Sequence, residues 1–445
     1  MAPRARSSSR GRSVGTVRAY PRSPNELRTG PDRLGFVTPP QRAPGGFPVV
    51  GIIGGGQLAR MCQPPSVGLS ITLSVLAESA DASAALVIPS APVGSHHDVA
   101  AVLAFARECD VVTFDHEHVP AEVLAALEAA GVVLRPSPAA LVFAQDKLAM
   151  RRRLTDMGVA CPRWAQVRDA LSLKAFGDEV GWPVVVKTPK GGYDGKGVRV
   201  VAAPDEAADW LGDVAHHVAR GGGLLVDGLL AEQKVDFVRE LTVLIARSPS
   251  GQASAWPVVE TVQTDGICTQ VLAPAPGLAP NLAAVVTEAG LRIAGELGVT
   301  GVMAVEMFEV RDAYTGEPAY MVNELAMRPH NSGHWTIDGA VTSQFEQHLR
   351  AVLDLPLGDT SPRARWTVMG NVLGGSYSDL YPAYRHLLAR DPALKIHLYG
   401  KGVRPGRKIG HVNVSGSDLD GLRARASHAS DYLQGAVTEC ASRMR

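Results

Sequence analysis

Short apolar segments alternate with longer mixed segments in the first part of the chain that reads as folded. The first apolar segment, VVGII at residues 49–53, ends in a glycine turn, GGGQLA, from Gly54. The expected strands are residues 49–53, 71–78, 111–114 and 132–134, and the expected helices are residues 97–108 and 121–130. Strands that alternate with helices form parallel sheets with crossover connections. The pattern therefore predicts a small parallel α/β domain.

A different pattern follows a helix that we expect at residues 145–157. Residues 183–187 and 198–201 read as strands, and the glycine-rich loop GGYDGKG at residues 191–197 joins them. The backbone N–H groups of such a loop can fold over phosphates, and Lys187 and Lys196 add positive charge. An ordinary long hairpin is the alternative for the loop taken alone. It is not a Walker loop, because no helix that begins with Lys-Ser or Lys-Thr follows it.

Further strands are expected at residues 229–235, 239–246, 301–308 and 320–325. The last two are apolar segments that are each interrupted by one acid, Glu306 and Glu324. A carboxylate in an apolar strand is costly unless it is paired or bound to a metal. A hard cation such as Mg²⁺ would hold two of them together and would bridge nucleotide phosphates. Two carboxylates on the solvent side of a sheet are the alternative.

The most concentrated chemistry lies directly after the last of these strands, in RPHNSGHW at residues 328–335. A cation, two imidazoles, an amide, a hydroxyl and an indole surround one glycine there. A pocket that holds a metal, a phosphate and a polar ring needs this mixture. A loop whose polar groups satisfy one another is the alternative.

The first 46 residues differ from the rest of the chain. Arginines stand among serines, prolines and glycines, and no acid occurs before Glu26. This composition resembles that of a transit peptide, but it has too little apolar surface to fold, so we expect a disordered tail.

Composition narrows the classes of partner. Hydrophobic residues make up 46% and charged residues 20%, as in an ordinary globular protein. Basic and acidic residues number 44 each, so no net charge favours nucleic acid or a membrane surface as a partner. The 5 cysteines are far apart, without a C-x-x-C pair, so neither a disulfide framework nor a zinc knuckle is expected. No apolar run approaches the ~18 residues of a membrane-spanning helix.

The glycine turn supports a competing hypothesis. Gly54, Gly56 and Ala59 fit the pattern G-x-G-x-x-A, and Glu78 ends the next expected strand. This arrangement is typical of a dinucleotide site with an acid for the ribose, so an NAD-dependent oxidoreductase is the alternative enzyme. That hypothesis leaves unused the glycine-rich loop, the paired acids and a basic loop, RPGRKIGH from Arg404.

The whole set of motifs resembles the ATP-grasp ligases, and most closely the 5-(carboxyamino)imidazole ribonucleotide synthases of purine biosynthesis. The motifs that carry the resemblance are GGGQLARM from Gly54, FDHEHVP from Phe114, QDKLAMRRRL from Gln145, KTPKGGYDGKG from Lys187, AEQKVDFVREL from Ala231, GVMAVEMF from Gly301, NELAMRPHNSGHWT from Asn323, SQFEQHLRA from Ser343 and VRPGRKIGHVN from Val403. Many ATP-grasp enzymes share the glycine-rich loop and the acids. RPHNSGHWT and RPGRKIGH are more specific to the synthases.

The resemblance implies a three-domain α/β ATP-grasp fold. Its parts are a tail at 1–46, an N-terminal parallel α/β domain at 47–145, a central lid domain at 146–235 and a C-terminal domain at 236–445 with a small β-rich terminal subdomain. The implied reaction joins bicarbonate to 5-aminoimidazole ribonucleotide with ATP and Mg²⁺, and releases ADP and phosphate. The resemblance further implies a cytoplasmic homodimer without nucleic-acid or membrane partners, whose product passes to a mutase.

The resemblance also assigns residues. The catalytic matches are Tyr193, Asp194, Lys196, Arg328 and Lys408. The ATP-binding matches are Lys147, Lys187, Gly191, Gly192, Gly195, Gly197, Glu232, Gln233, Lys234, Val235, Glu240, Gln263, Asn323 and Glu324. The substrate-binding matches are Gln57, Glu117, His330, Asn331, Ser332, Lys401 and Arg407, and the metal-binding matches are Glu306 and Glu324.

Two departures and two alternatives accompany this assignment. Gln263 stands where some relatives carry a histidine, and its role is open. Ala59 stands where relatives often carry glycine. Another ATP-grasp ligase of purine biosynthesis, and a nucleotide-binding module without catalytic activity, are the remaining alternatives.

Overall fold

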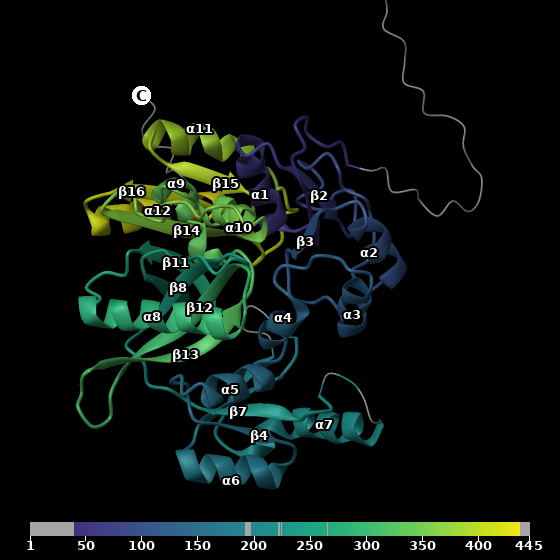
Figure 1. The fold of residues 1–445 in the computed structure, drawn as a ribbon. Coiled ribbons are helices and arrows are strands. Elements are labelled where there is room, and N and C mark those ends of the chain that lie inside the picture. Colours follow the sequence, from purple (N-terminus) through teal and green to yellow (C-terminus); the bar gives the residue numbers. More distant parts are fainter. Residues whose placement is uncertain (1–39, 192–196, 221–222, 224, 265, 437–445) are drawn as a thin grey trace, which may run out of the picture. The chain divides into compact units, whose positions relative to one another are not determined.

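The strands form three sheets of 3, 4 and 9 strands within the described residues. The structure is a computed structural model, and it describes residues 40–191, 197–220, 223, 225–264 and 266–436. The three sheets follow the chain in order, from purple and blue through teal to green and yellow (Figure 1). Among the helices in these ranges, none has both the length and the apolar character that a membrane crossing requires.

The first sheet is parallel, as the sequence predicts, and its strand order is β2-β1-β3. Its strands are β1 (Val49–Ile53), β2 (Thr72–Leu76) and β3 (Val111–Phe114), and its helices are α1 (Gln57–Gly68), α2 (Val99–Ala106), α3 (Ala121–Ala129) and α4 (Pro138–Gln145). All residues of β1 and β3 are buried, which explains why their sequences are almost entirely apolar. Thr113 of β3 is the exception, and its hydroxyl forms a hydrogen bond with His348 Nε2 at 2.9 Å. The expected strand at 132–134 is wrong, because only an isolated bridge joins Val112 to Leu134.

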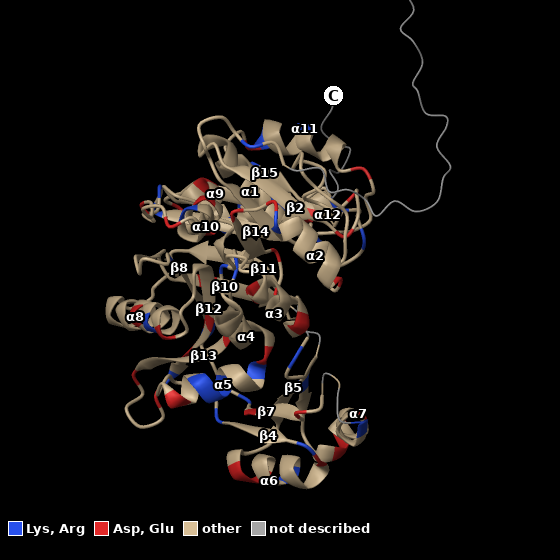
Figure 2. Cartoon of the chain, turned by 45° about the vertical axis from the view of Figure 1, so that its right-hand side comes forward, with Lys and Arg blue, Asp and Glu red and all other residues tan. Residues whose placement is uncertain are grey.

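The second sheet is antiparallel, with the order β4-β7-β5-β6. Its elements are α5 (Lys147–Asp156), β4 (Trp164–Val167), α6 (Ala170–Val180), β5 (Val184–Lys187), β6 (Val198–Val201), α7 (Ala208–Arg220) and β7 (Leu229–Gln233). The helix expected at 145–157 is confirmed as α5, although Gln145 belongs to the end of α4. The carboxylate of Asp146 accepts the backbone N–H groups of Leu148 and Ala149, so it caps α5 and separates it from α4. Helix α5 carries a run of basic residues, drawn in blue in Figure 2.

The third sheet has the order β13-β12-β8-β10-β11-β14-β16-β15, with β9 paired to β8. Its strands are β8 (Arg239–Arg247), β9 (Ala253–Ala255), β10 (Val259–Thr264), β11 (Ile267–Ala273), β12 (Gly301–Arg311), β13 (Pro318–Ala326), β14 (Trp366–Leu373), β15 (Lys395–Leu398) and β16 (Lys408–Gly416). Its helices are α8 (Pro280–Glu296), α9 (Thr336–Gly339), α10 (Gln344–Val352), α11 (Tyr381–Arg390) and α12 (Leu419–Gln434).

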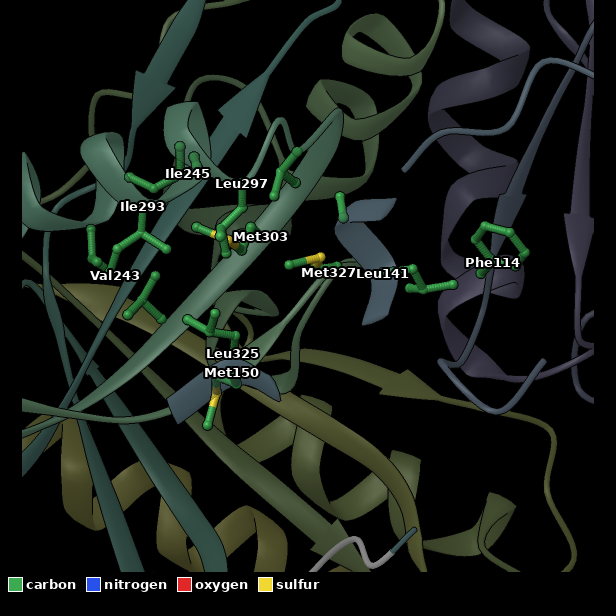
Figure 3. Packing of buried hydrophobic residues seen from close by; sticks show 14 of the residues in the cluster. Phe114, Leu141, Met150, Val243, Ile245, Ile293, Leu297, Met303, Leu325 and Met327 are labelled. Atoms are coloured by element: carbon green, nitrogen blue, oxygen red, sulfur yellow. The ribbon is translucent and has the colours of Figure 1, made fainter. Parts of the chain in front are cut away.

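One apolar cluster continues from the third sheet to the first. Helix α8 contributes Ile293, which packs with Val243 and Met303 of the sheet (Figure 3). The same cluster includes Met150 of α5 and Phe114 of β3. Burying side chains of this size stabilises the fold by roughly 1.5–3 kcal/mol each. The strand ends that carry polar residues are therefore held by a shared core.

The last residues of the segment that the sequence assigns to the tail, 40–46, lie within the described part. The Arg42 guanidinium donates two hydrogen bonds to the Asp110 carboxylate, at 2.7 and 3.2 Å. Both side chains are about half exposed, so this pair contributes little to stability.

Candidate active site

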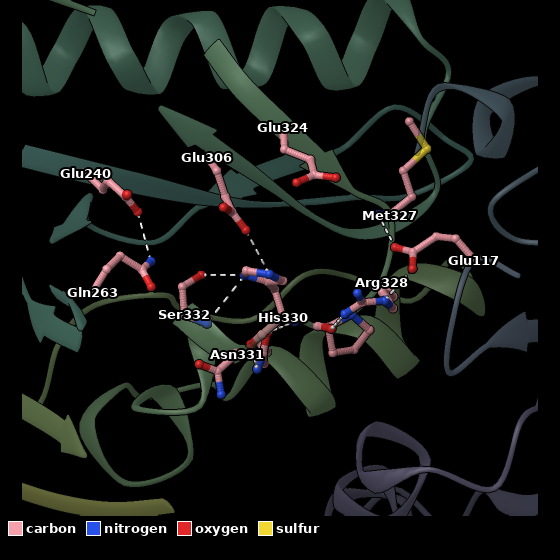
Figure 4. A network of polar contacts seen from close by, with 12 residues as sticks. Glu117, Glu240, Gln263, Glu306, Glu324, Met327, Arg328, His330, Asn331 and Ser332 are labelled. Carbon is pink, nitrogen blue, oxygen red and sulfur yellow. Dashed lines mark hydrogen bonds and ion pairs between the residues drawn. The ribbon is translucent and has the colours of Figure 1, made fainter. Parts of the chain in front are cut away.

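Three acids lie on one face of the third sheet. Glu306 of β12 is opposite Glu324 of β13, and Phe308, two residues further along β12, is opposite Glu240 of β8. Residues two apart in a strand share a face, so all three carboxylates point to the same side (Figure 4). The sequence-predicted acids are therefore neighbours.

A β-bulge next to this pair brings Asn323 into the site. Glu306 is opposite Glu324, but Met307 is opposite Val322, so Asn323 is the extra residue of β13. A bulge re-aims side chains locally. The Asn323 amide oxygen accepts a hydrogen bond from Lys187 Nζ at 3.1 Å, and Lys147 Nζ lies 3.2 Å from Glu324 Oε1. Two predicted lysines thus reach the edge that carries the acids.

Gln263 has a definite contact in this structure. Its amide nitrogen donates to Glu240 Oε2 at 2.8 Å. Burial raises the pKa of Glu240, the Gln263 hydrogen bond opposes this shift, and the negative charge of Glu306 adds to it. The position that departs from the family pattern therefore helps to hold the carboxylate that the resemblance assigns to the ribose.

A buried ionic cluster fixes Lys187. Lys187 Nζ lies 2.7 Å from Glu232 Oε2, and Arg151 Nε lies 2.5 Å from Glu232 Oε1. Arg151 also donates to the backbone oxygen of Asn323 at 2.7 Å, and its side chain is fully buried. Burial opposes ionisation of Glu232, but Arg151 and Lys187 outweigh it and lower the pKa of Glu232. We call Arg151, Lys187, Glu232 and Asn323 the Arg151 cluster.

Sequence reasoning assigned Arg151 no role, because it is one arginine of the run RRR and such runs usually lie on the surface. The arginines of this run differ in the fold: Arg151 is buried, whereas Arg152 is exposed. Helical periodicity alone could have distinguished them, because Leu148, Arg151 and Leu154 share the buried face of α5.

The segment 232–235, which the resemblance assigns to ATP binding, includes the end of β7 in the second sheet. Glu232 and Gln233 close β7, and Lys234 and Val235 follow in the connection to β8, with Lys234 exposed. The Gln233 backbone N–H donates to Arg163 O at 2.8 Å. The Glu232 side chain is used within the Arg151 cluster.

The loop after β13 is held in a fixed shape. The His330 backbone N–H donates to Gln344 Oε1 at 2.8 Å, and Gln344 Nε2 donates back to His330 O at 2.8 Å. His330 Nδ1 lies 2.9 Å from Ser332 Oγ, and its Nε2 lies 3.0 Å from Glu306 Oε1. Gln344 is fully buried, and although the motif SQFEQHLRA contains it, sequence reasoning assigned it no role. It orients the imidazole toward the acids.

Neighbours of His330 are held as firmly. The side-chain amides of Asn331 and Asn371, a residue of β14, exchange hydrogen bonds at 2.9 and 2.8 Å. Arg328 Nε donates to Glu117 Oε2 at 2.7 Å, and burial is outweighed by this cation, which lowers the pKa of Glu117. The resemblance placed both Arg328 and Glu117 near the substrate, and the structure pairs them with each other.

The basic C-terminal loop leads into β16. The Gly374 N–H donates to Arg407 O at 2.7 Å, Gly406 has φ of +75°, and the exposed Arg407 guanidinium donates to Gly402 O at 3.2 Å. Lys408 is half-buried, and its charge helps to lower the pKa of Glu306, after a larger effect of His330 that overcomes burial. Lys401 Nζ donates to Gln57 Oε1 at the start of α1. This loop thus joins the acids to the N-terminal sheet.

Only the ends of the glycine-rich loop can be placed. Gly191 and Gly197 both have positive φ, +70° and +74°, and Thr188 N donates to Gly197 O at 3.0 Å. Gly192, Tyr193, Asp194, Gly195 and Lys196 lie outside the described residues.

The N-terminal glycine turn carries polar groups of its own. Gly55 N–H donates to Glu78 Oε2 at 3.1 Å, and Ala59 N–H donates to Asp115 Oδ1 at 2.7 Å. His116 lowers the pKa of Glu78 to about 2 despite partial burial. Burial, with smaller contributions from His116 and His97, lowers the pKa of His96 to about 4. At neutral pH Glu78 is therefore ionised and His96 is neutral.

Three family models match consecutive parts of the chain. The ribonucleotide synthetase preATP-grasp domain matches residues 48–145, the ATP-grasp domain residues 152–345, and the phosphoribosylaminoimidazole carboxylase C-terminal domain residues 367–425. The first match corresponds to the parallel sheet with the glycine turn. It leaves the oxidoreductase alternative without support.

Relatives match over most of the chain. N5-carboxyaminoimidazole ribonucleotide synthase of Mycobacterium tuberculosis (strain ATCC 25618 / H37Rv) is 52% identical over 87% of this chain and 88% of its own. The synthase of Corynebacterium ammoniagenes is 47% identical over 89% and 95%.

Solved structures agree with these matches. The synthetase of Thermus thermophilus has a TM-score of 0.73 at 35% identity, over 86% of this chain and 98% of its own. The Aspergillus clavatus synthase in complex with ADP and 5-aminoimidazole ribonucleotide has a TM-score of 0.76 at 30% identity, over 88% and 99%. With its ATP-grasp α/β fold and this degree of identity, the chain belongs to the N5-carboxyaminoimidazole ribonucleotide synthase family of ATP-grasp ligases.

Proposed function

We propose that this protein carboxylates 5-aminoimidazole ribonucleotide with bicarbonate and ATP, forming N5-carboxyaminoimidazole ribonucleotide, ADP and phosphate in purine biosynthesis. The observation that carries the proposal is the meeting of Glu306 and Glu324 with His330 on one sheet face (Figure 4). In this proposal the two acids bind the metal ion of a metal–nucleotide complex, and the His330 loop binds a second, polar substrate beside it. Relatives solved with ATP and with ADP plus the ribonucleotide support this division.

ATP is held by cations and by the glycine-rich loop in this proposal. Lys147 and Lys187 reach the edge of the acids from α5 and β5, and both are largely buried, so their charges are poorly screened. Gly191 and Gly197 allow the loop to turn sharply at both ends. Glu240 lies on the same face of the sheet as Glu306, where its carboxylate can accept hydrogen bonds from the ribose hydroxyls.

The acids fit Mg²⁺ because both are oxygen donors that lie opposite each other on adjacent strands. Glu306 and Glu324 would hold the ion, which when bound would neutralise negative charge on the phosphates. In this structure Glu306 Oε1 lies 3.0 Å from His330 Nε2, and Glu324 Oε1 lies 3.2 Å from Lys147 Nζ.

Bicarbonate is a poor electrophile, so its activation requires transfer of the γ-phosphoryl group to give carboxyphosphate. The exocyclic amine of the ribonucleotide then attacks the carbonyl carbon of carboxyphosphate, or of CO₂ released from it. An N–C bond forms, and phosphate is the leaving group. The protein chiefly positions reactants and offsets charge in such transfers. In this proposal Arg328, His330 and Ser332 position the imidazole ring of the ribonucleotide, and Arg407 and Lys408 supply charge for its phosphate. The resemblance also assigns catalytic roles to Tyr193, Asp194 and Lys196, which lie outside the described residues.

We further propose that the protein is a cytoplasmic homodimer whose product passes to a mutase. Sedimentation of the purified chain tests the dimer, because a mass of one 46.9 kDa chain would contradict it.

The test of function is ADP release by the purified protein with ATP, Mg²⁺ and bicarbonate, with and without 5-aminoimidazole ribonucleotide. We expect turnover to depend on both bicarbonate and the ribonucleotide. Turnover with formate in place of bicarbonate would identify another purine ligase. Nucleotide binding without turnover under every condition would identify a binding module.

A further inference from the structure

Two imidazoles and a carboxylate gather beside the N-terminal glycine turn, apart from the acids of the third sheet. Glu78 follows β2, His96 precedes α2 and His116 follows β3, so all three come from the carboxyl ends of the parallel strands or the loops that leave them. Ligands of open α/β sheets bind at this edge, where neighbouring connections leave in opposite directions. One ligand atom from each residue lies within 4.8 Å of the others.

We propose that Glu78, His96 and His116 form a binding site for a divalent transition-metal ion of the Zn²⁺ or Co²⁺ class. Two imidazoles and one carboxylate are the donors that such ions take, whereas Mg²⁺ takes oxygen donors. Three protein ligands leave at least one position for water or for an oxygen of a bound molecule. The site is separate from the proposed Mg²⁺ site at Glu306 and Glu324.

The first observation is a spacing that suits a shared ion better than a hydrogen bond. His116 Nε2 and Glu78 Oε1 are 3.7 Å apart, longer than the 2.7–3.2 Å of ordinary N–H···O bonds. Two ligand atoms at about 2.1 Å from one tetrahedral ion lie about 3.4 Å from each other. Only a small movement of either side chain would bring both into coordination distance.

The second, independent observation is an unsatisfied atom. His96 Nδ1 is buried and has no hydrogen-bond partner in the described part of the chain. A buried polar nitrogen without a partner is unfavourable, and coordination to an ion would remove this cost. The His96 and His116 rings meet edge to face with centroids 4.6 Å apart, and one ligand atom of each lies within 4.8 Å of the other and of a Glu78 carboxylate oxygen.

Backbone geometry also fits the cluster. A Cβ atom on Gly54 would lie 2.9 Å from the His116 ring, so glycine is what permits the imidazole to lie over this turn. Against the site, His116 Nδ1 accepts the His118 N–H at 3.2 Å. Coordination through Nε2 would place a proton on Nδ1 and break this long hydrogen bond.

The experiment uses the full chain, treated with a chelator and kept free of nucleotide. Co²⁺ is added while visible absorption is recorded, and Zn²⁺ is then titrated to displace it and followed by calorimetry. We expect one saturable Zn²⁺ site whose Co²⁺ form has the intense bands of low-coordinate cobalt. Glu78→Gln, His96→Ala and His116→Ala should each weaken Zn²⁺ binding at least roughly tenfold.

Two controls distinguish this site from others. His97→Ala removes an exposed imidazole that lies against His96 at 4.2 Å between ring centroids but is not one of the three ligands, and it should retain binding. Glu306→Gln should also retain binding, because it alters only the acid pair. Glu78→Gln keeps an oxygen for the Gly55 N–H, so it decides the matter if the histidine variants fail to fold. Absence of saturable binding, retention in Glu78→Gln, or equal loss in His97→Ala or Glu306→Gln would overturn the proposal.

Discussion

At the scale of single residues, the site consists of charges that are held close to one another against their mutual repulsion or their burial. Glu306 and Glu324 lie opposite each other, and each has a nitrogen partner: His330 Nε2 at 3.0 Å from Glu306 and Lys147 Nζ at 3.2 Å from Glu324. Such preorganised charges are effective because they need no rearrangement when the reacting groups arrive. Changing one of them without changing its volume isolates its electrostatic role.

Glu324→Gln is therefore expected to abolish most of the ribonucleotide-dependent ADP release while the fold persists. It removes one of the two carboxylates proposed for Mg²⁺ and leaves Lys147 with a neutral partner. The loss of kcat should be roughly 10²-fold or more. Glu317→Gln, at an exposed glutamate just before β13, is the matched control. Near-normal turnover of Glu324→Gln at saturating Mg²⁺ would exclude a metal role for Glu324.

Arg151→Met is expected to destabilise the protein and to raise the Michaelis constant for ATP. It leaves Glu232 buried with Lys187 as its remaining cationic partner in the cluster, and loss of one partner of a buried pair costs about 3–5 kcal/mol. Thermal unfolding measures the first effect and steady-state kinetics the second. Arg151→Lys should restore part of the ATP affinity, since it restores the charge.

The neighbouring Arg152→Met is the control for this prediction. Arg152 is exposed and donates one hydrogen bond, to Gln166 at 2.8 Å, so its removal should change the free energy of unfolding by less than about 0.5 kcal/mol. Equal effects of the two substitutions would mean that the Arg151 cluster does not position Lys187.

At the scale of elements, local pattern determined what could be predicted. β1 and β3 were predicted with their observed bounds, because fully buried strands give short, mainly apolar runs, which here are followed by Gly54 and Asp115. Residues 132–134 form one bridge only, because an apolar triplet does not reveal whether a neighbouring strand offers it a full ladder. The bulge at Asn323 and the order of nine strands depend on pairings far apart in sequence, which no local pattern records.

Strand β16 begins at Lys408, and the proposed role of this residue in binding the ribonucleotide phosphate can be tested directly. Lys408→Ala is expected to raise the Michaelis constant for 5-aminoimidazole ribonucleotide at least tenfold, by loss of a charge-assisted contact worth about 1.5–3 kcal/mol. The constant for ATP should change little, because Lys147 and Lys187 lie elsewhere. Lys395→Ala, at an exposed residue of β15, is the control. A selective effect on ATP would place the ribonucleotide phosphate away from this loop.

At the scale of the whole folded part, buried ion pairs join segments that are far apart in sequence. Glu117, which follows β3, pairs with Arg328, which follows β13, and the Arg151 cluster joins α5, β5, β7 and β13. The pKa of Glu117 and that of Glu232 lie below the ordinary 4.5. The unfolded chain therefore binds more protons than the folded protein as the pH falls below that value. The stabilisation from these carboxylates is present above about pH 4.5 and is lost through the folded-state pKa.

Glu117→Gln tests this linkage. At neutral pH it should lower the melting temperature, because Arg328 loses its buried anionic partner. As the pH falls from about 5 toward 2, the melting temperature of the wild-type protein should fall faster than that of the variant. The difference between the two melting temperatures should therefore shrink. A difference in melting temperature that stays constant over this range would show that the Glu117 charge does not stabilise the fold.

The Arg151 cluster also restricts which amino-acid substitutions its positions can accept during evolution. Its four residues come from four separate elements. Each forms an ion pair or a hydrogen bond with another member of the cluster, in a largely buried environment. Replacing Arg151 or Glu232 alone leaves a buried charge without its partner and destabilises the protein. A second replacement that removes the remaining charge reverses that destabilisation, so the effects of the two substitutions on the free energy of unfolding are not additive. These positions are therefore expected to be inherited together, and a descendant that changes one of them should carry a matching change in another.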